Sequence, residues 1–377
     1  MTRRVYRSTD YGAPNIQGQA QKLIDFLQAV LVDGYGTQTL SAGALTASGT
    51  TCTLVTPIAH GWVGTAKITV AGATPSAYNG EFSATVTGAN TVKYTALSAP
   101  GTSPATGTIT VKLAGAGWTK PAGRVGTNVA AFKQGVGSSG FYLNVDDTNT
   151  TYSIVRGYED MTAVNTGTGL FPTTTQSATG LYMVKSSTAD TTNRPWVCVA
   201  TEEFFTLYID TNSSGTGAQS NIHFFGDIAS YIPGDSTRAM LKANTGTTYS
   251  ATTFAPNTSI SSSFAGAYLS RPYSQLTGAA TVSITTDYSK GGAGNFGNGG
   301  MPYPNPADNG VYLSKVWIGE SATGTLRGEI PGILNPLHAA PFQHLETFNG
   351  IGDFAGRTFQ AVKFYSSSQL CLEISDT

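Results

Sequence analysis

The segment Leu31-Val32-Asp33-Gly34-Tyr35-Gly36 leads into a stretch rich in Thr, Ala and Gly, and the segment Ala114-Gly115-Ala116-Gly117-Trp118-Thr119-Lys120-Pro121 leads out of it. Between these segments the chain alternates apolar and polar residues, as a small β domain does. A β scaffold tolerates insertion at an exposed Gly-rich loop, because the entropic cost of closing a loop grows slowly with its length. We therefore predict a host formed by residues 1–37 and 114–377, with a small β module inserted at 38–113.

The chain carries few charges for its size. Only 11 % of its 377 residues are charged, against about 25 % in an ordinary globular protein. The formal net charge is -1, so we expect no basic field for nucleic acid. Hydrophobic residues make up 40 % of the chain, which excludes a disordered polar chain. A surface of Thr, Ser, Asn, Gln and Gly suits a protein that packs against copies of itself.

The N-terminal residues Met1-Thr2-Arg3-Arg4-Val5-Tyr6 lack the apolar region of a signal peptide. The sequence also has no apolar run of about 18 residues, so we expect neither export by a cleaved signal nor membrane insertion. Cys52, Cys198 and Cys371 lie far apart, without CxxC or Cys/His spacing. We expect them to be buried free thiols in a reducing cytoplasm.

One segment has the apolar periodicity of an amphipathic helix. Its apolar stripe is formed by Ala20, Leu23, Ile24, Leu27, Val30 and Leu31. Pro14 and Asn15 stand before it, and Gly34 supplies a stop signal. We expect the stripe to pack on a sheet of the host, with partner binding as the alternative.

The remainder of the chain indicates short strands, because its 45 glycines favour turns over long helices. In the module we expect strands at 51–55, 66–70, 81–86, 91–95 and 107–112, forming a small barrel or sandwich. In the host we expect strands, at sandwich-like spacing, at 132–134, 140–146, 153–158, 180–185, 195–200, 204–209, 221–228, 311–318, 359–364 and 369–374. The fold class is thus mostly β, a sandwich-like host with one N-terminal helix.

Two long segments interrupt the strands of the host. Residues 244–263 are of low complexity and rich in Thr, Ser and Ala, whereas 289–309 combine a glycine run with a Pro-rich run. Long loops usually carry function or mobility. We predict that both segments dock on neighbouring subunits, and the host has a candidate internal boundary near 244–263.

The histidines and acidic pairs do not suggest a catalytic or metal site. His60, His223, His338 and His344 lack metal-ligand spacing. Neighbouring carboxylates, as in Asp146-Asp147, Glu159-Asp160 and Glu202-Glu203, point to opposite faces of a strand and cannot form an acid/base pair by themselves. We expect a solvated edge or turn at these pairs, and calcium bound by Asp146, Asp147 and a loop carbonyl is the alternative.

Further motifs also do not indicate a catalytic or binding site. The run Gly291 to Gly300 lacks the Lys-Ser/Thr ending of a phosphate loop, and no Gly-x-Ser-x-Gly is present. Trp62, Trp118, Trp196 and Trp317 are expected in the core or at interfaces, with a sugar-stacking platform as the alternative. We predict no catalytic, cofactor-binding or metal-binding residue, no cofactor and no enzyme activity.

Several strings of the host together resemble a family of tailed-bacteriophage virion structural proteins. They include Gly140-Phe141-Tyr142-Leu143-Asn144-Val145-Asp146-Asp147, Arg156-Gly157-Tyr158-Glu159-Asp160-Met161, Arg194-Pro195-Trp196, Phe225-Gly226-Asp227-Ile228 and Arg327-Gly328-Glu329-Ile330-Pro331-Gly332. The resemblance covers about 1–37 and 114–377, and in such relatives the two seams join almost directly. Within the module, His60-Gly61-Trp62 and Val70-Ala71-Gly72-Ala73-Thr74-Pro75-Ser76-Ala77-Tyr78-Asn79-Gly80 resemble a β module that recurs in phage structural proteins.

The resemblance and the composition together predict a structural subunit of a tailed-phage virion. Such a subunit acts by self-assembly and by docking to other virion proteins, in the tail or its tip or as a capsid decoration. Its partners are copies of itself and other virion proteins, and it is assembled in the cytoplasm of the bacterial host. The alternative is an adhesin for a host surface or glycan, with the module as its binding part.

Overall fold

The computed structural model describes residues 2–248, 266–285, 302–338, 341–364 and 368–375. Most of the regular structure in these residues is antiparallel β-sheet, which confirms the mostly-β class. The predicted docking segments lie partly outside the described residues, at 249–263 and 289–301.

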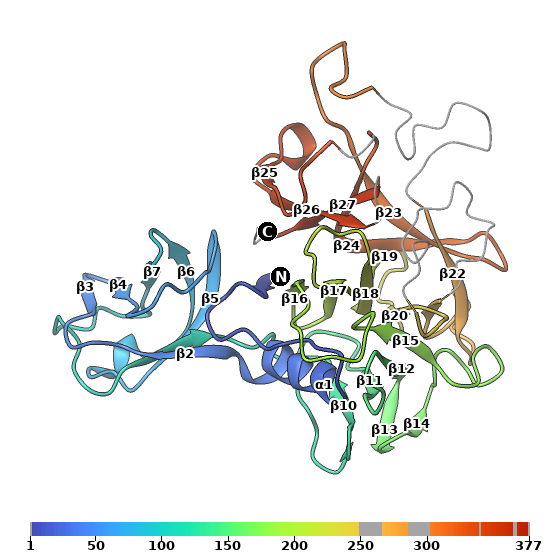
Figure 1. The fold of residues 1–377 in the computed structure, drawn as a ribbon, viewed down its shortest axis with the longest axis horizontal. Helices are drawn as coiled ribbons and strands as arrows, with labels where there is room; N and C mark the ends of the chain where they lie inside the picture. Colours follow the sequence, from blue (N-terminus) through green and yellow to red (C-terminus); the bar gives the residue numbers. More distant parts are fainter. Residues whose placement is uncertain (1, 249–265, 286–301, 339–340, 365–367, 376–377) are drawn as a thin grey trace.

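The largest sheet has thirteen strands and runs through the centre and the C-terminal part of the molecule (Figure 1). Its strands, in the order in which they pair, are β1 (Arg4–Arg7), β16 (Trp196–Ala200), β17 (Phe204–Asp210), β18 (Ser220–Asp227), β20 (Ala239–Lys242), β21 (Ala267–Leu269), β22 (Ala280–Thr285), β23 (Leu313–Glu320), β24 (Leu326–Pro336), β27 (Ser368–Glu373), β26 (Thr358–Phe364) and β25 (Thr347–Asn349), with β19 (Ala229–Ser230) paired to β24. A 3-10 turn, η3 (Gly352–Phe354), lies between β25 and β26.

The central strand β17 is buried on both faces. Phe205 and Leu207 belong to one apolar cluster, whereas Phe204 and Tyr208 belong to another. Successive side chains of a strand point to opposite faces of the sheet. The sheet therefore separates two cores, one shared with the N-terminal elements and one shared with β22 to β27.

The first core is closed by a second sheet and by the helix. The strands of this sheet, in pairing order, are β15 (Leu181–Val184), β12 (Tyr152–Tyr158), β11 (Tyr142–Asp146), β10 (Val129–Lys133) and β9 (Val125–Gly126), and beside it lies the hairpin of β13 (Asp160–Ala163) and β14 (Thr166–Thr168). Val145 and Val155 of the second sheet share a cluster with Leu207 and Phe225 of the large sheet. Two sheets thus enclose this core face to face.

The helix comprises α1 (Lys22–Leu27) and the π-helical segment η1 (Gln28–Asp33), and it ends at Gly34 with φ of 74°. Leu23, Ile24, Leu27, Val30 and Leu31 are buried, as the apolar stripe predicted. The stop at Gly34 is also confirmed, because a positive φ favours glycine. The helix begins at Lys22, later than Pro14 and Asn15 suggest. Its first N–H groups are bound by a residue that lies far away in the sequence, so the local sequence does not mark the start.

That residue is Asp147, which follows β11. Its Oδ2 accepts hydrogen bonds from the backbone N–H groups of Leu23 at 2.7 Å and Ile24 at 3.3 Å. Its Oδ1 contacts the ammonium group of Lys185 and accepts a hydrogen bond from the Ser153 hydroxyl. A carboxylate at a helix N-terminus satisfies free N–H groups and interacts favourably with the helix dipole. Asp147 therefore fixes the helix to the second sheet.

Residues 35–113 form a seven-stranded sheet of their own at one end of the molecule (Figure 1, left). Its strands, in pairing order, are β2 (Tyr35–Thr39), β8 (Thr110–Leu113), β5 (Thr65–Ala71), β6 (Gly80–Val86), β7 (Thr91–Thr95), β4 (Thr51–Val55) and β3 (Leu45–Ser48), with a 3-10 turn, η2 (Ser76–Tyr78), before β6. Its side chains alternate between buried and exposed, as in β5 and β6. The alternation that predicted a small β unit is therefore present.

Both seams of this unit meet at the end of the helix. Tyr35 pairs with Leu113 in the antiparallel ladder of β2 and β8. The returning chain donates hydrogen bonds from the N–H groups of Ala116 and Trp118 to the carbonyls of Val30 and Leu31, at 3.0 Å each. The helix C-terminus, which needs acceptor partners, thus holds the seam.

A buried carboxylate, Asp10, lies beside the same seam. Its Oδ2 accepts hydrogen bonds from the Tyr35 hydroxyl at 2.7 Å and from the Arg7 N–H at 2.8 Å. Burial raises the pKa of Asp10 to about 6, and these hydrogen bonds offset only part of the increase.

Most predicted strands are present, but the longest strand was missed. β24 contains Gly328, Pro331, Gly332 and Pro336, which all disfavour regular strands. Its register with β23 shifts at two places, which accommodates these residues. The prediction also missed β22 and several short strands, among them β1, β2, β3, β20 and β21. It placed the start of β8 too early, at Gly107.

Replacing Asp147 with Ala is expected to lower the free energy of unfolding by about 3–5 kcal/mol, because Lys185 would stay buried without its partner and the helix would lose its cap. Urea unfolding followed by circular dichroism measures this change. The control is Asp146→Ala, which removes a partly exposed carboxylate that accepts a hydrogen bond from the Thr148 N–H. Its cost should stay within about 1 kcal/mol, and equal costs at the two positions would contradict the assignment.

Asp10 makes stability depend on pH with a defined sign. The folded protein binds this proton more tightly than the unfolded chain, so the contribution of Asp10 is present below about pH 4 and is lost as the pH rises to about 6. The loss is on the order of 3 kcal/mol. Asp10→Asn should therefore stabilise the protein relative to wild type more at pH 7 than at pH 4, as measured by urea unfolding. The control is Asp33→Asn, at an exposed carboxylate, and an equal pH dependence for the two variants would contradict the assignment to Asp10.

Candidate functional site

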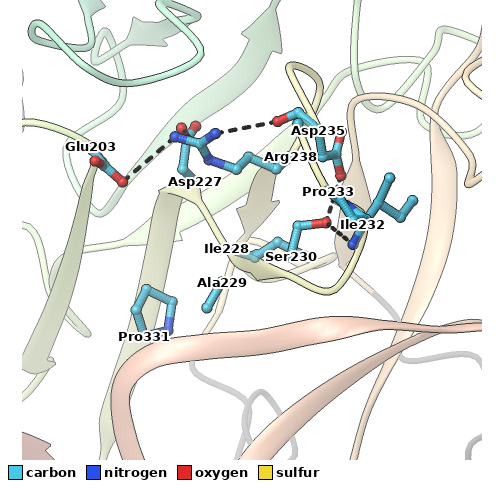
Figure 2. A pocket seen from close by; sticks show the side chains of 11 residues that line it. Glu203, Asp227, Ile228, Ala229, Ser230, Ile232, Pro233, Asp235, Arg238 and Pro331 are labelled. Atoms are coloured by element: carbon cyan, nitrogen blue, oxygen red, sulfur yellow. Dashed lines mark hydrogen bonds and ion pairs between the residues drawn. The ribbon is translucent and has the colours of Figure 1, made fainter.

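A cavity of about 340 Å³ opens beside the connection between β18 and β20 (Figure 2). It combines apolar and proline side chains with charged ones. Its lining consists of Glu203, Asp227, Ile228, Ala229, Ser230, Ile232, Pro233, Gly234, Asp235, Arg238 and Pro331. Glu203 directly precedes β17, Asp227 ends β18 and Pro331 lies in β24, so the site joins both halves of the large sheet.

Arg238 joins the walls of this cavity. Its Nε lies 2.9 Å from Asp227 Oδ2, and one terminal nitrogen lies 3.7 Å from Glu203 Oε2. The same guanidinium donates to the carbonyls of Asp235 and Gly137, at 3.3 Å each. Figure 2 shows this side chain reaching across between Glu203, Asp227 and the loop of Asp235. A planar, permanently charged group with several donors is suited to such a cross-link.

Asp227 is fully buried and also binds the turn between β10 and β11. It accepts hydrogen bonds from Gln134 Nε2 at 2.9 Å and from the Ser139 N–H at 2.8 Å. Burial raises the pKa of Glu203, and the neighbouring Asp227 raises it further, while Arg238 lowers it. The carboxylates of this wall are thus held by donors from three separate segments of the chain.

Arg327 organises the opposite side of the cavity and is fully buried. It lies 2.9 Å from Asp235 and 2.6 Å from Glu320, and it donates to the Arg271 carbonyl at 3.0 Å. Burial acts to raise the pKa of Asp235, but hydrogen bonds from Ser230, Thr237 and Arg327 together hold it below its usual value. Breaking a buried ion pair of this kind is costly, so the segments around it are firmly positioned.

Large apolar side chains project to solvent from the segments that this ionic network holds. Val136 is 89 % exposed and Leu276 is 69 % exposed. Tyr231, Tyr273 and Leu326 are also exposed, and we refer to these five residues, grouped because their segments are held by the same ionic network, as the apolar face. Val136 precedes Gly137, the Tyr231 N–H donates to the Arg327 carbonyl, and Tyr273 and Leu276 follow Arg271. The arrangement can present a preformed apolar surface to a binding partner.

A second cavity of about 490 Å³ lies where the seven-stranded sheet meets the large sheet. Thr2, Arg4, Thr201, Glu202 and Glu203 line it from the large-sheet side, and Lys67 and Glu81 line it from the other. The buried Arg4 forms an ion pair with Glu81 at 3.0 Å and lies 3.8 Å from Glu202. The lining is therefore polar and mixed in charge.

The four histidines lie in separate places. His60 stacks on Trp62, and His223 lies 3.4 Å from the Val184 carbonyl, where burial lowers its pKa to about 3. His338 accepts a hydrogen bond from the Tyr312 N–H, and His344 accepts one from the Lys363 N–H. Within the described parts of the chain, no group of three His, Cys, Asp or Glu residues could hold a metal ion.

Other sequence candidates are also located. Cys52, Cys198 and Cys371 are buried free thiols, as predicted. Trp62, Trp118 and Trp196 are buried and Trp317 is partly buried, as core packing predicted. The prediction of a solvated edge or turn is wrong for Asp147, because its two oxygens are occupied by helix N–H groups, Ser153 and Lys185.

Sequence reasoning missed the Arg238 and Arg327 network. Its members are far apart in the chain and form no local motif. One signal was present, since Asp227 directly follows the apolar segment Ile222-His223-Phe224-Phe225-Gly226. In a chain with so few charges, an acidic residue at the end of such a segment indicates a buried ion pair.

No protein-family model matches this chain, and no curated protein sequence matches it significantly. Among the described residues, no helix combines the length and the apolar character that crossing a membrane requires.

Arg238→Gln is expected to lower the free energy of unfolding by about 1–3 kcal/mol, because Asp227 would keep its burial but lose its cation. The estimate is reduced because Arg238 is itself partly exposed. Urea unfolding tests it, with Arg156→Gln as a matched control, since Arg156 donates to the surface carbonyl of Ala178. An unchanged stability for Arg238→Gln would contradict its role as a cross-link.

Proposed function

We propose that this protein is a structural subunit of a tailed-phage virion that acts by self-assembly and by docking to other virion proteins. The observation that carries the proposal is the apolar face, held in place by the Arg238 and Arg327 network. Exposed apolar surface on a preformed scaffold is typical of protein interaction sites. The resemblance of the host strings to phage virion proteins supplies the biological setting.

The distribution of charge supports association between copies. Several of the few charged residues are buried in ion pairs, including Arg327, Glu320 and Glu373. Little charge is left to keep neighbouring copies apart. The proposed contact regions also include the two predicted docking segments, 244–263 and 289–309.

We further propose that residues 38–113 are an inserted module on a sandwich-like host. The pairing of Tyr35 with Leu113 brings the two seams together, and directly opposed residues of an antiparallel pair lie only about 5 Å apart. A short connection would therefore close the host without the module. The end position of the module (Figure 1) suits an outward orientation in a particle.

The second candidate is an adhesin for a host surface or glycan. The cavity between the module and the large sheet favours it, because Arg4, Lys67 and Glu81 could present polar groups to a sugar. For the subunit itself, two locations in the virion fit the proposal: the tail or its tip, and the capsid surface as a decoration protein. Assembly would take place in the cytoplasm of the bacterial host.

A double substitution, Val136→Lys with Leu276→Lys, tests the role of the apolar face. It should weaken self-association at least tenfold, because each buried lysine carries a desolvation cost of more than about 1.4 kcal/mol. Light scattering over a range of protein concentrations measures the association. Leu97→Lys is the control, because Leu97 is 98 % exposed on the seven-stranded unit. Equal association of all three proteins would contradict the proposed contact region.

Deleting residues 38–113 separates the two candidate functions. Particles that carry the deletion should assemble if the host is the structural subunit, because the seams are adjacent. Counting assembled particles and measuring their adsorption to host cells gives both readouts. Loss of adsorption with normal assembly would favour the adhesin function of the module, and failure of assembly in a folded deletion variant would contradict the host–module division.

A further inference from the structure

A lysine and an aspartate are in direct contact inside the first core. Asp147 follows β11 and Lys185 follows β15, the two strands on either side of β12. Both side chains are almost completely buried, and the Lys185 Nζ contacts Asp147 Oδ1. The position of the ammonium group is fixed further by the Asn149 carbonyl, which accepts a hydrogen bond from Nζ at 3.0 Å. The two groups are therefore held together without intervening solvent.

The donors around Asp147 polarise its carboxyl group unequally. Oδ2 accepts the N–H groups of Leu23 and Ile24, at 2.7 and 3.3 Å. Two backbone N–H groups directed at one oxygen are the arrangement that stabilises the oxyanion of an acyl-transfer intermediate. Oδ1 instead accepts the Ser153 hydroxyl at 2.5 Å and faces Lys185. One oxygen is thus placed to remain as a carbonyl, and the other is placed to leave.

Burial also favours the protonation states that react. It raises the pKa of Asp147 and lowers the pKa of Lys185, although the pair partly opposes both changes. A neutral amine is nucleophilic, and a protonated carboxylic acid can lose its hydroxyl group as water. Exclusion of bulk water from the site also disfavours hydrolysis of the product.

We propose that Lys185 and Asp147 condense to an intramolecular isopeptide bond. The lone pair of the neutral Lys185 Nζ attacks Cγ of the protonated Asp147, and a C–N bond forms. The charge that develops on Oδ2 is stabilised by the N–H groups of Leu23 and Ile24. One proton moves from Nζ directly to Oδ1, which it contacts, so that the Cγ–Oδ1 bond breaks and one water molecule leaves. No oxidant, reductant or cofactor takes part.

The product relieves an energetic cost of the unreacted pair. In its charged form, the pair pays a large desolvation penalty that the attraction between the two charges only partly offsets. An amide is neutral, its Oδ2 retains the two helix N–H donors, and its N–H can donate to the Asn149 carbonyl. The new bond would also connect β11 to β15 across β12, which restricts the unfolded chain.

The intact mass of the purified full-length chain tests the proposal. The expected mass is that of the sequence minus one water molecule. Trypsin should fail to cleave after Lys185, and tandem mass spectrometry should find the peptides of Asp147 and Lys185 joined. The proposal would be overturned if the folded wild-type chain has the full mass of its sequence and trypsin cleaves it normally after Lys185.

Two matched variants place the bond. Lys185→Arg keeps a cation beside Asp147 but lacks the reactive amine, so its mass should show no loss of water. Lys133→Arg changes a lysine whose ammonium lies over the Tyr142 ring, and its mass should still show the loss. A loss of water in Lys185→Arg, or its disappearance in Lys133→Arg, would contradict the assignment to Lys185.

Discussion

The contact between Asp147 and the N-terminus of α1 is the interaction on which the remainder of the structure depends. It supplies partners for N–H groups that a buried helix end cannot leave free. Once the helix is fixed, the carbonyls of Val30 and Leu31 lie where the returning chain at Ala116 and Trp118 can bind them. A carboxylate that follows a strand of the second sheet therefore helps to position the seven-stranded unit.

A second constraint is the burial of β17 on both faces. A strand of this kind needs a layer on each side, and the helix with the second sheet forms one layer while β22 to β27 form the other. Arg238 and Arg327 tie these layers together at one edge, next to the apolar face. The same ion pairs would keep the apolar face in a single conformation. A surface that is already ordered reduces the entropic cost of association.

The parts of the fold that follow from local pattern were predictable. The stripe from Leu23 to Leu31 and the alternation in 66–70 and 91–95 each depend on residues that are close in the sequence. The parts set by distant residues were not predictable, and the helix start is the clearest example, because its capping residue is more than a hundred positions away. β24 was missed because its glycines and prolines suggest a loop, whereas pairing on both edges holds it in a sheet. The candidate site is similar, since Asp227, Arg238 and Glu203 come together only in the folded chain.

The central functional claim is that this protein works by associating through surfaces that its fold holds ready. Sedimentation velocity of the wild-type chain over a wide concentration range measures this most directly. We expect a discrete oligomer that forms reversibly or is already complete, with an interface on the order of 2,000 Å². A protein that sediments as a monomer at every concentration, and that does not enter particles, would contradict it.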